Sequence, residues 1–203
     1  MNGKTEVFGN QGALFMNAMT WWDHTTNSVW SQVWGRAIEG PLKGTELELL
    51  PAQTVPWGTW KAQYPDTLLM TNGLGGFRLR GETFQPNYVI GVELQGAARA
   101  YPYQKAADER VINDSLNGRP LVVVVNPETK AVAVFLRQVD ERILTFVWEN
   151  EQLVDRETGS VWDPVRGLAL RGPQQGQALR ALPYVPAFPT AWRDFYPQTT
   201  FYE

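Results

Sequence analysis

The sequence contains no cysteine and only one histidine, His24. Without cysteine the chain can form no disulfide, no thiolate nucleophile, no cysteine-ligated zinc site and no iron–sulfur cluster. A single histidine excludes a metal site built from several histidines of one chain, and a Ser-His-Asp triad would have to use His24 itself. We therefore expect no metal site and no cofactor.

Long apolar runs and clustered positive charge are missing as well. No run of about 18 apolar residues occurs, which predicts a protein without a transmembrane segment. Residues 1–6 lack the apolar stretch of a signal peptide, so a cytoplasmic protein and an exported protein after signal removal both stay open. The 18 lysines and arginines are scattered, and the net charge is −3. Nucleic-acid binding is not expected, because it depends on clustered basic side chains.

The residues that are present indicate a folded, soluble protein built on an internal repeat. Hydrophobic residues make up 43% of the 203 positions and charged residues 19%, which is enough apolar material for a core. Residues 23–70 match residues 155–202 at a constant offset of 132 positions. Of these 48 positions 18 are identical, against about 3 expected by chance. The chain therefore contains an internal duplication.

Most of the repeated residues are turn formers and aromatic residues. Each copy contains the pattern Asp-x-x-Thr-x-Ser-x-Trp, which starts at Asp23 and at Asp155. Short polar side chains in such a pattern bond to nearby backbone, so it predicts a turn followed by a strand with a buried tryptophan. Near the end of each copy, residues 57–64 and 187–196 have the spacing of a short amphipathic helix that ends before a proline.

Between the two copies lies a stretch that occurs once and has the pattern of β-strands. Residues 89–95 alternate between apolar and polar side chains, and residues 143–148 form a further apolar strand. Residues 121–125 and 131–137 are joined by a turn sequence, which is typical of a hairpin. The sequence therefore predicts an α+β fold of predominantly antiparallel strands with short helices.

We divide the predicted fold into two pseudo-symmetric repeat units within one globular body. Residues 1–70 form a partial first unit, residues 71–87 a connection, and residues 88–203 a complete second unit. The first unit is interpreted as partial because residues 5–8 are the only strand segment assigned ahead of its motif at Asp23, whereas residues 89–148 supply several strands ahead of the second motif. We expect this to leave a sheet edge or an apolar face uncovered. A partner chain or a second copy of the protein is predicted to cover it.

A family resemblance is carried by the second copy and by the stretch before it. The second copy reads Asp-Arg-Glu-Thr-Gly-Ser-Val-Trp-Asp from Asp155, followed by Gly-x-Ala, Gly-Pro, Gly and Leu-Pro. The stretch before it contains Val89-x-Gly-Val and Ala98-Arg-Ala-Tyr-Pro. In this combination the chain resembles DUF3179, a bacterial family of unassigned function, over residues 5–70 and 88–202. The resemblance implies a Cys-Pro-x-Cys segment in the first unit, which this chain lacks.

Carboxylates are the first candidates for chemistry. Asp155, Glu157 and Asp163 lie close together in the sequence, and as a group they would suit a hydrolase that uses general acid–base catalysis. The first copy keeps the aspartate as Asp23 but has a threonine and a serine in place of the other two. The alternative, which we favour, is that each repeated aspartate accepts backbone N–H bonds within its turn.

The chain is rich in tryptophan, with nine in total. Trp30 and Trp162, and likewise Trp60 and Trp192, occupy equivalent positions in the two copies and are predicted to be core anchors. The other five have no tryptophan at the repeat offset, so they either fill space or form exposed surfaces that stack on sugars or anchor protein partners. These five are Trp21, Trp22, Trp34, Trp57 and Trp148.

The leading functional hypothesis is a non-catalytic binding or scaffolding module that acts with a protein partner or as an oligomer. It follows from the repeated residues, which are turn formers and core aromatics rather than reactive groups. Two alternatives stay open: a carboxylate-based hydrolase, and a carbohydrate- or peptide-binding protein that uses the unpaired tryptophans. A perturbed carboxylate pair facing a cleft would favour the hydrolase, and a planar row of exposed indoles would favour the ligand-binding protein.

Overall fold

The computed structural model describes residues 3, 5–68 and 86–203. Within these ranges the chain forms 18 strands and three helices of seven residues each. The strand pairings in this part are antiparallel except for one parallel pair, β18 (Thr200–Phe201) with β6 (Ala97–Pro102). This confirms the prediction of a β-rich fold with mostly antiparallel strands and short helices. Most of the predicted connection, residues 71–85, lies outside the described ranges.

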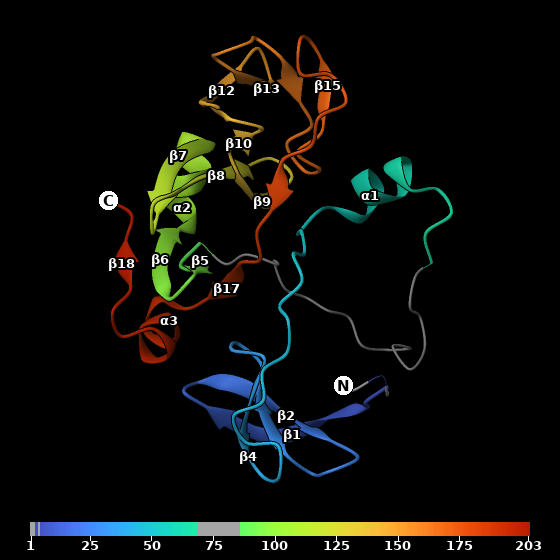
Figure 1. Ribbon diagram of the computed structural model, residues 1–203, viewed down its shortest axis with the longest axis vertical. Coiled ribbons are helices and arrows are strands. Elements are labelled where there is room, and N and C mark those ends of the chain that lie inside the picture. The colour runs from blue at the N-terminus through green and yellow to red at the C-terminus, as the bar shows by residue number, and fades with distance from the viewer. Residues whose placement is uncertain (1–2, 4, 69–85) are drawn as a thin grey trace.

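Four strands form the N-terminal sheet, drawn in blue in Figure 1. Their order is β1 (Phe8–Phe15), β2 (Ala18–Asp23), β3 (Val29–Ser31) and β4 (Arg36–Glu39). Met16 and Asn17 join β1 to β2 with positive φ angles of 50° and 61°, as in a type I′ hairpin turn. β1 lies at the edge of the sheet, and most of its residues are exposed.

The segment after β4 leaves the N-terminal sheet and reaches the C-terminal part of the molecule (Figure 1). Thr54 in this segment forms an isolated antiparallel bridge with Val132, and its backbone N–H donates to the hydroxyl of Tyr184 at 3.0 Å. Helix α1 (Trp57–Gln63) follows directly. The segment therefore links the two parts through a backbone contact, and it carries α1 away from the N-terminal sheet.

Two four-stranded sheets form the centre of the C-terminal part. One has the order β17 (Val185–Ala187), β5 (Val89–Leu94), β6, β18, and the other has the order β16 (Arg180–Ala181), β9 (Ala131–Leu136), β8 (Arg119–Asn126), β7 (Val111–Leu116). The predicted hairpin is β8–β9. Its turn is held by the side-chain oxygen of Asn126, which accepts the backbone N–H groups of Glu128 and Thr129, each at 3.0 Å.

Strand β8 is buried on both faces because its side chains alternate between two hydrophobic clusters. Leu121 and Val123 pack in a cluster with Ile90 of β5. Val122, between them, packs on the opposite face in a cluster with Trp162. This position between two cores accounts for the continuous apolar run in the sequence of β8.

A second small sheet covers the outer face of β8 and β9. Its order is β12 (Phe146–Glu149), β13 (Gln152–Asp155), β14 (Val161–Trp162) and β15 (Ala169–Arg171), and the short hairpin β10 (Gln138–Val139) and β11 (Arg142–Ile143) precedes it. Asn113 of β7 attaches the edge strand. Its side-chain amide donates to the carbonyl of Phe146 at 2.7 Å, and its side-chain oxygen accepts the N–H of Phe146 at 2.8 Å.

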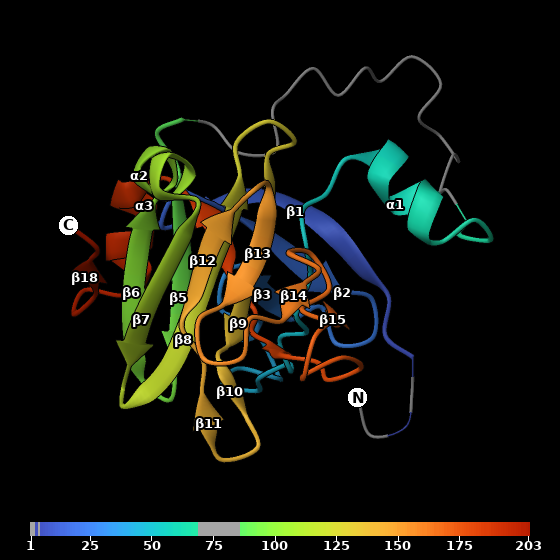
Figure 2. The same cartoon turned by 90° about the horizontal axis from the view of Figure 1, so that it is seen from above.

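The helices lie at opposite sides of the molecule. Helix α2 (Tyr103–Glu109) follows β6, and α3 (Pro189–Phe195) precedes β18. Figures 1 and 2 place α1 on the side away from α2 and α3. No helix within the described ranges has the length and apolar character that crossing a bilayer requires.

Candidate functional site

The carboxylate of Asp23 is buried in the first repeated turn, among hydrogen-bond donors. It accepts the backbone N–H of Thr26 at 2.5 Å, the backbone N–H of Ser28 at 3.1 Å and the indole N–H of Trp30 at 2.9 Å. Burial would raise the pKa of this carboxyl, but the hydrogen bonds outweigh burial and lower the pKa to about 2. Asp23 is therefore a charged acceptor at neutral pH and a weak base.

Asp155 shares two of these donor types in the second repeated turn, a backbone N–H and an indole N–H. It accepts the backbone N–H of Thr158 at 2.6 Å and the indole N–H of Trp162 at 2.8 Å. The hydroxyls of Thr158 and Ser160 lie 2.7 Å apart, and the Ser160 hydroxyl oxygen accepts the backbone N–H of Gln174 at 3.0 Å. These are the hydrogen bonds that the turn interpretation expects of both repeated aspartates.

The other two predicted carboxylates lie in separate surroundings. Glu157 is exposed and accepts a backbone N–H at 2.7 Å. Asp163 is buried, accepts the backbone N–H groups of Val165 and Arg166, each at 2.9 Å, and pairs with Arg166 Nε at 2.9 Å. Asp163 lines a small cavity of about 180 Å³ beside α1, and Asp155 and Glu157 do not line that cavity. Within the described ranges no group of three or more His, Asp or Glu side chains is arranged to hold a metal.

Two of the five unpaired tryptophans lie on β2 and pack against their own sheet. Trp21 is half-buried, with its ring centroid 6.2 Å from that of Phe8. Trp22 is also half-buried and stacks on His24, with centroids 4.2 Å apart and an interplanar angle of 6°. Neighbouring side chains therefore cover part of both indoles.

The remaining three are distributed over other elements. Trp57 is 47% exposed at the start of α1. Trp148 on β12 lies under the guanidinium of Arg110, 5.8 Å from the ring centroid, and its buried Nε1 has no hydrogen-bond partner. Trp34, after β3, lines a cavity between the N-terminal and C-terminal parts of the chain. The five indoles therefore do not form one row, and their role in binding stays a prediction.

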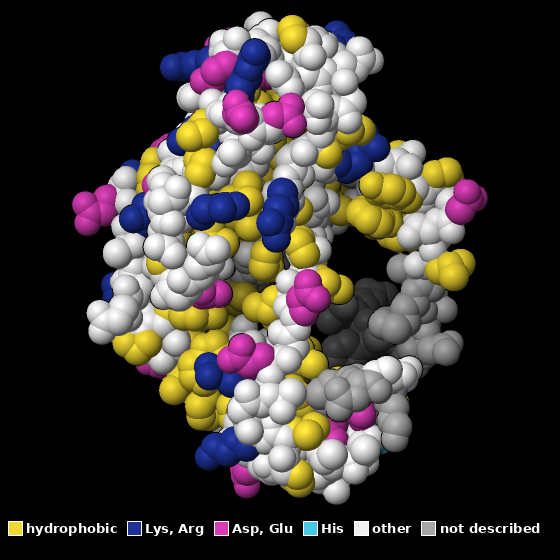
Figure 3. Space-filling view, in the orientation of Figure 1, with side chains coloured by type: hydrophobic (Ala, Val, Ile, Leu, Met, Phe, Trp, Pro, Cys, Tyr) yellow, Lys and Arg dark blue, Asp and Glu magenta, His cyan; other side chains and the backbone are white. Residues whose placement is uncertain are grey.

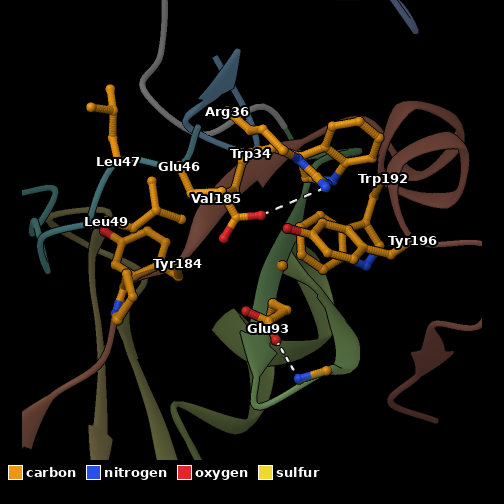
Figure 4. A pocket seen from close by; sticks show the side chains of 13 residues that line it. Trp34, Arg36, Glu46, Leu47, Leu49, Glu93, Tyr184, Val185, Trp192 and Tyr196 are labelled. Carbon is orange, nitrogen blue, oxygen red and sulfur yellow. Dashed lines mark hydrogen bonds and ion pairs between the residues drawn. The ribbon is translucent and has the colours of Figure 1, made fainter. Parts of the chain in front are cut away.

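This cavity, which we call the cleft, lies between β4 and the segment after it on one side and β5 and α3 on the other (Figure 4). Its volume is about 420 Å³. Trp34, Leu47 and Leu49 line it from the N-terminal part, and Val185 and Trp192 line it from the C-terminal part. The cleft thus exists only because segments far apart in the sequence meet.

Three charged side chains line the cleft. The guanidinium of Arg36 lies 4.5 Å from the ring centroid of Trp34, and its Nη1 atom lies 3.6 Å from Glu46 Oε1. Glu93, on β5, accepts the backbone N–H of Gly96 at 2.6 Å. Figure 4 shows the carboxylate of Glu46 reaching toward Arg36 in the middle of the cleft. With two carboxylates and one guanidinium, these side chains carry a net charge of −1.

Tyr196 contributes a neutral hydroxyl to the same cleft. Its ring centroid lies 4.3 Å from that of Trp192. Burial raises the pKa of Tyr196 to about 12, the negative charge of Glu93 adds to the rise, and Arg36 opposes it. Tyr196 is therefore a hydrogen-bond donor at neutral pH, and its hydroxyl faces into the cleft (Figure 4).

Of the cleft residues, the sequence reasoning named Trp34 and missed the polar ones. A signal for two of them was present in the repeat. At the offset of 132, the counterparts of Arg36 and Glu46 are Leu168 and Ala178. Charged residues that occur in one copy only are not needed by the shared turn, and that difference points to a local role.

Helices α1 and α3 occupy equivalent positions in the two copies but differ in burial. In α3, Trp192 is 1% exposed and lies against Gly91 of β5, where a Cβ atom would come within 2.4 Å of the indole. In α1, no residue is buried. The prediction that Trp60 is a core anchor is therefore wrong for the described part of the chain, where Trp60 is only half-buried and Trp192 is packed on β5.

The exposed aromatic and apolar side chains of this region form a surface that we call the α1 face, comprising Trp57, Trp60, Tyr64 and Leu68. Trp60 is half-buried, and the other three are 47%, 38% and 94% exposed. Figure 3 shows hydrophobic side chains gathered on the surface over α1. Thr59, on the helix, lines the cavity of about 180 Å³ that separates α1 from β8 and β9. Helix α1 is therefore loosely packed on that side as well.

Comparison with known proteins identifies one family. The sequence model of that family, described as a protein of unknown function (DUF3179), matches the chain twice, over residues 1–82 and over residues 82–202. No curated protein and no solved structure matches the chain. The double match agrees with an internal duplication and assigns no activity.

Proposed function

The chain belongs to the DUF3179 family, and we propose that it is a non-catalytic binding module that acts together with a protein partner. The observation that carries the proposal is the difference between the two equivalent helices. Trp192 and Phe195 of α3 are buried, whereas in α1 Trp57 is 47% exposed and Trp60 is only half-buried. An exposed apolar surface of this kind is typical of a protein-binding site. The partner is proposed to cover the α1 face.

The proposal takes the chain as two pseudo-symmetric repeat units, of which residues 88–203 are the complete one. Contacts that recur in both halves support this. Phe8 meets the ring of Trp30 edge-on with centroids 5.6 Å apart, and Phe146 meets Trp162 edge-on at 5.6 Å. Phe8 precedes its turn aspartate by 15 positions (23 − 8) and Phe146 by 9 (155 − 146). The same contact is thus made across hairpins that differ by six residues in length.

The second unit indicates what the partner has to present. Trp192 packs on Gly91 in β5, which is paired with antiparallel strands on both sides. Trp60 holds the same place in α1, and its indole N–H bonds to Thr67 at 3.1 Å, as that of Trp192 bonds to Thr199 at 2.8 Å. We therefore propose that the partner presents an antiparallel sheet with a glycine under Trp60.

A second copy of the chain is less suited to this role than a different chain. The strand that would accept a helix, β5, already carries α3, because Trp192 of the same chain covers Gly91. We therefore propose that the partner is a different chain. The homo-oligomer predicted from the sequence is the alternative outcome of the test.

The non-catalytic part of the proposal rests on the carboxylates. Asp155 and Asp163 are buried acceptors within their own turns, and Glu157 accepts a backbone N–H. No observation favours the carboxylate-based hydrolase. The alternative of a carbohydrate- or peptide-binding protein is favoured by one observation, which is that Trp34 lines the cleft. The cleft is a different surface from the α1 face.

The test is site-specific photo-crosslinking in the native host. Ala62, exposed on α1, is replaced by p-benzoyl-phenylalanine, and Gln104, exposed on α2, is replaced likewise as the matched control. We expect a discrete covalent adduct from position 62 only, and its loss when Trp57→Ala and Trp60→Ala are added.

The proposal is wrong if position 62 gives no adduct, if position 104 gives the same one, or if the adduct survives both tryptophan substitutions. An adduct at twice the chain mass of 22.9 kDa would replace the partner by a second copy.

A further inference from the structure

We propose that the cleft binds a small organic cation, an amine or guanidine carried on a short apolar chain, between its aromatic wall and the carboxylates of Glu46 and Glu93. This site is separate from the α1 face. It is lined by β4 and the residues before and after it, and by residues of β5, β17 and α3 with Tyr196 directly after α3. The inference therefore does not depend on the proposed protein partner.

The size and lining of the cleft are those of a ligand site. Its volume of about 420 Å³ falls within the range of about 300–1,000 Å³ for small-molecule pockets. The rings of Trp34 and Tyr196 and the side chains of Leu47 and Val185 supply an apolar wall. A small number of polar groups on such a wall is the arrangement that orients a ligand.

The charges favour a cation over an anion. Arg36 and Glu46 form an ion pair at 3.6 Å, with side chains 39% and 67% exposed. Exposed pairs of this kind are screened by water and contribute little stability, so a ligand can draw Glu46 away from the pair at little cost. An anion that approached Arg36 would also meet Glu46 and Glu93, whereas a cation meets two carboxylates and one guanidinium.

The chain itself shows how a cation is held here. The guanidinium of Arg36 lies over the Trp34 ring at 4.5 Å and points toward the carboxylate of Glu46 (Figure 4). One cation is thus contacted by a ring face and by a carboxylate. Tyr196 and Glu93 provide a second ring and carboxylate. Glu93 lies close enough to Tyr196 for its negative charge to add to the raised pKa of that hydroxyl. We place the ligand cation at this second pair.

Comparison of the two copies indicates that the repeated turn does not require these residues. At the offset of 132, Trp34 corresponds to Arg166, Arg36 to Leu168 and Glu46 to Ala178. The second turn forms its hydrogen bonds with Arg166 paired to Asp163 in place of the indole, and with the uncharged Leu168 and Ala178 in place of the Arg36–Glu46 pair. The cleft residues of the first copy are therefore available for recognition.

The test is a titration of the full chain, followed by the indole N–H signals in ¹H–¹⁵N spectra and by calorimetry. The probes are n-butylamine, N-acetyl-lysine methylamide, the neutral 1-pentanol and the anion pentanoate. We expect one or both amines to bind and to shift the Trp34 signal. We expect the other two probes to bind at least about tenfold more weakly, because they lack the positive charge. Preference between the amines distinguishes a free amine from a lysine side chain of a peptide.

The control variants keep the fold and change the charge. Glu46→Gln combined with Glu93→Gln is expected to reduce amine affinity about tenfold. Glu48→Gln, an exposed position in the same segment that does not line the cleft, is expected to leave it unchanged. Thermal unfolding of each variant verifies folding, and added salt should weaken amine binding to the unaltered protein.

Three results would overturn the proposal. The first is the absence of amine binding up to about 10 mM, the weak end of specific affinity. The second is binding of pentanoate or 1-pentanol that equals that of the amines. The third is amine binding that neither salt nor the double variant weakens.

Discussion

Trp162 donates its indole N–H to the carboxylate of Asp155 over 2.8 Å, although the two residues are seven positions apart and lie on different strands. Trp30 and Asp23 make the same bond at 2.9 Å. All four side chains are buried. Each carboxylate accepts N–H groups from its own turn as well as from the indole, so it fixes the indole at the start of the strand. The bond therefore ties the turn to the core.

Removing this acceptor should cost much of the stability of the protein. Asp155→Ala leaves the indole N–H of Trp162 and the backbone N–H of Thr158 without their acceptor, and each such buried donor costs about 1–3 kcal/mol. We expect the free energy of unfolding to fall by about 3 kcal/mol, measured by urea denaturation. Glu157→Ala, at an exposed position two residues away, should cost less than about 1 kcal/mol. Similar losses in the two variants would contradict this account of the turn.

Acid should weaken the first turn within a defined pH range. The pKa of Asp23 is lowered from 3.8 to about 2 in the folded protein. A lowered pKa stabilises the fold above the unfolded-state value, and this contribution is lost as the pH falls from about 4 toward 2. Thermal unfolding of the unaltered protein and of Asp23→Asn should therefore be compared from pH 5 to pH 2. The variant should start less stable and lose less across this range, whereas parallel curves would show that Asp23 makes no such contribution.

The equivalent tryptophans of α1 and α3 should respond differently to truncation. Trp192 is 1% exposed, so Trp192→Ala should lower the free energy of unfolding by about 3–5 kcal/mol. Trp60 lies on a helix with no buried residue, so Trp60→Ala should cost less than about 1 kcal/mol in the isolated protein. Denaturant titrations of the two variants give a direct comparison. Equal costs would mean that Trp60 is packed in solution and that the α1 face is already covered.

Two glycines provide a second matched pair. A Cβ atom at Gly91 would lie 2.4 Å from the Trp192 ring, so Gly91→Ala should destabilise the fold by about 1–3 kcal/mol through overpacking. Gly58 in α1 has no atom within 4 Å of an added Cβ, so Gly58→Ala should stabilise the helix by about 0.5–1 kcal/mol. Melting temperatures should therefore move in opposite directions. A fall in both would indicate that α1 packs more closely than described.

Local patterns in the sequence were sufficient to predict the repeated turns and the β8–β9 hairpin. The partners of Asp155 lie within seven residues of it, and the turn after β8 is held by Asn126 within three residues. Local chemistry decides such features, and it is visible in the sequence.

Features that depend on contacts between distant segments were not predicted. Trp60 and Trp192 share a local motif, yet in the described part of the chain Trp192 is buried against β5 and Trp60 is half-buried, so the motif alone could not give their burial. The cleft joins Glu46 to Glu93 and Tyr196 through the packing of two sheets and a helix. Periodicity and spacing within one segment do not predict that these distant segments pack against one another.

The edge-on contacts of Phe8 with Trp30 and of Phe146 with Trp162 have the same centroid distance, 5.6 Å, although the first hairpin is longer. Its additional residues extend the β1–β2 tip, where residues 10–14 are exposed. The hairpin length is thus uncoupled from the anchoring contact. At the tip, Phe15 meets Phe195 of α3 edge-on with centroids 6.1 Å apart, and Asn17 donates to Asp194 at 3.4 Å. The longer hairpin is therefore an arm by which the N-terminal sheet reaches α3.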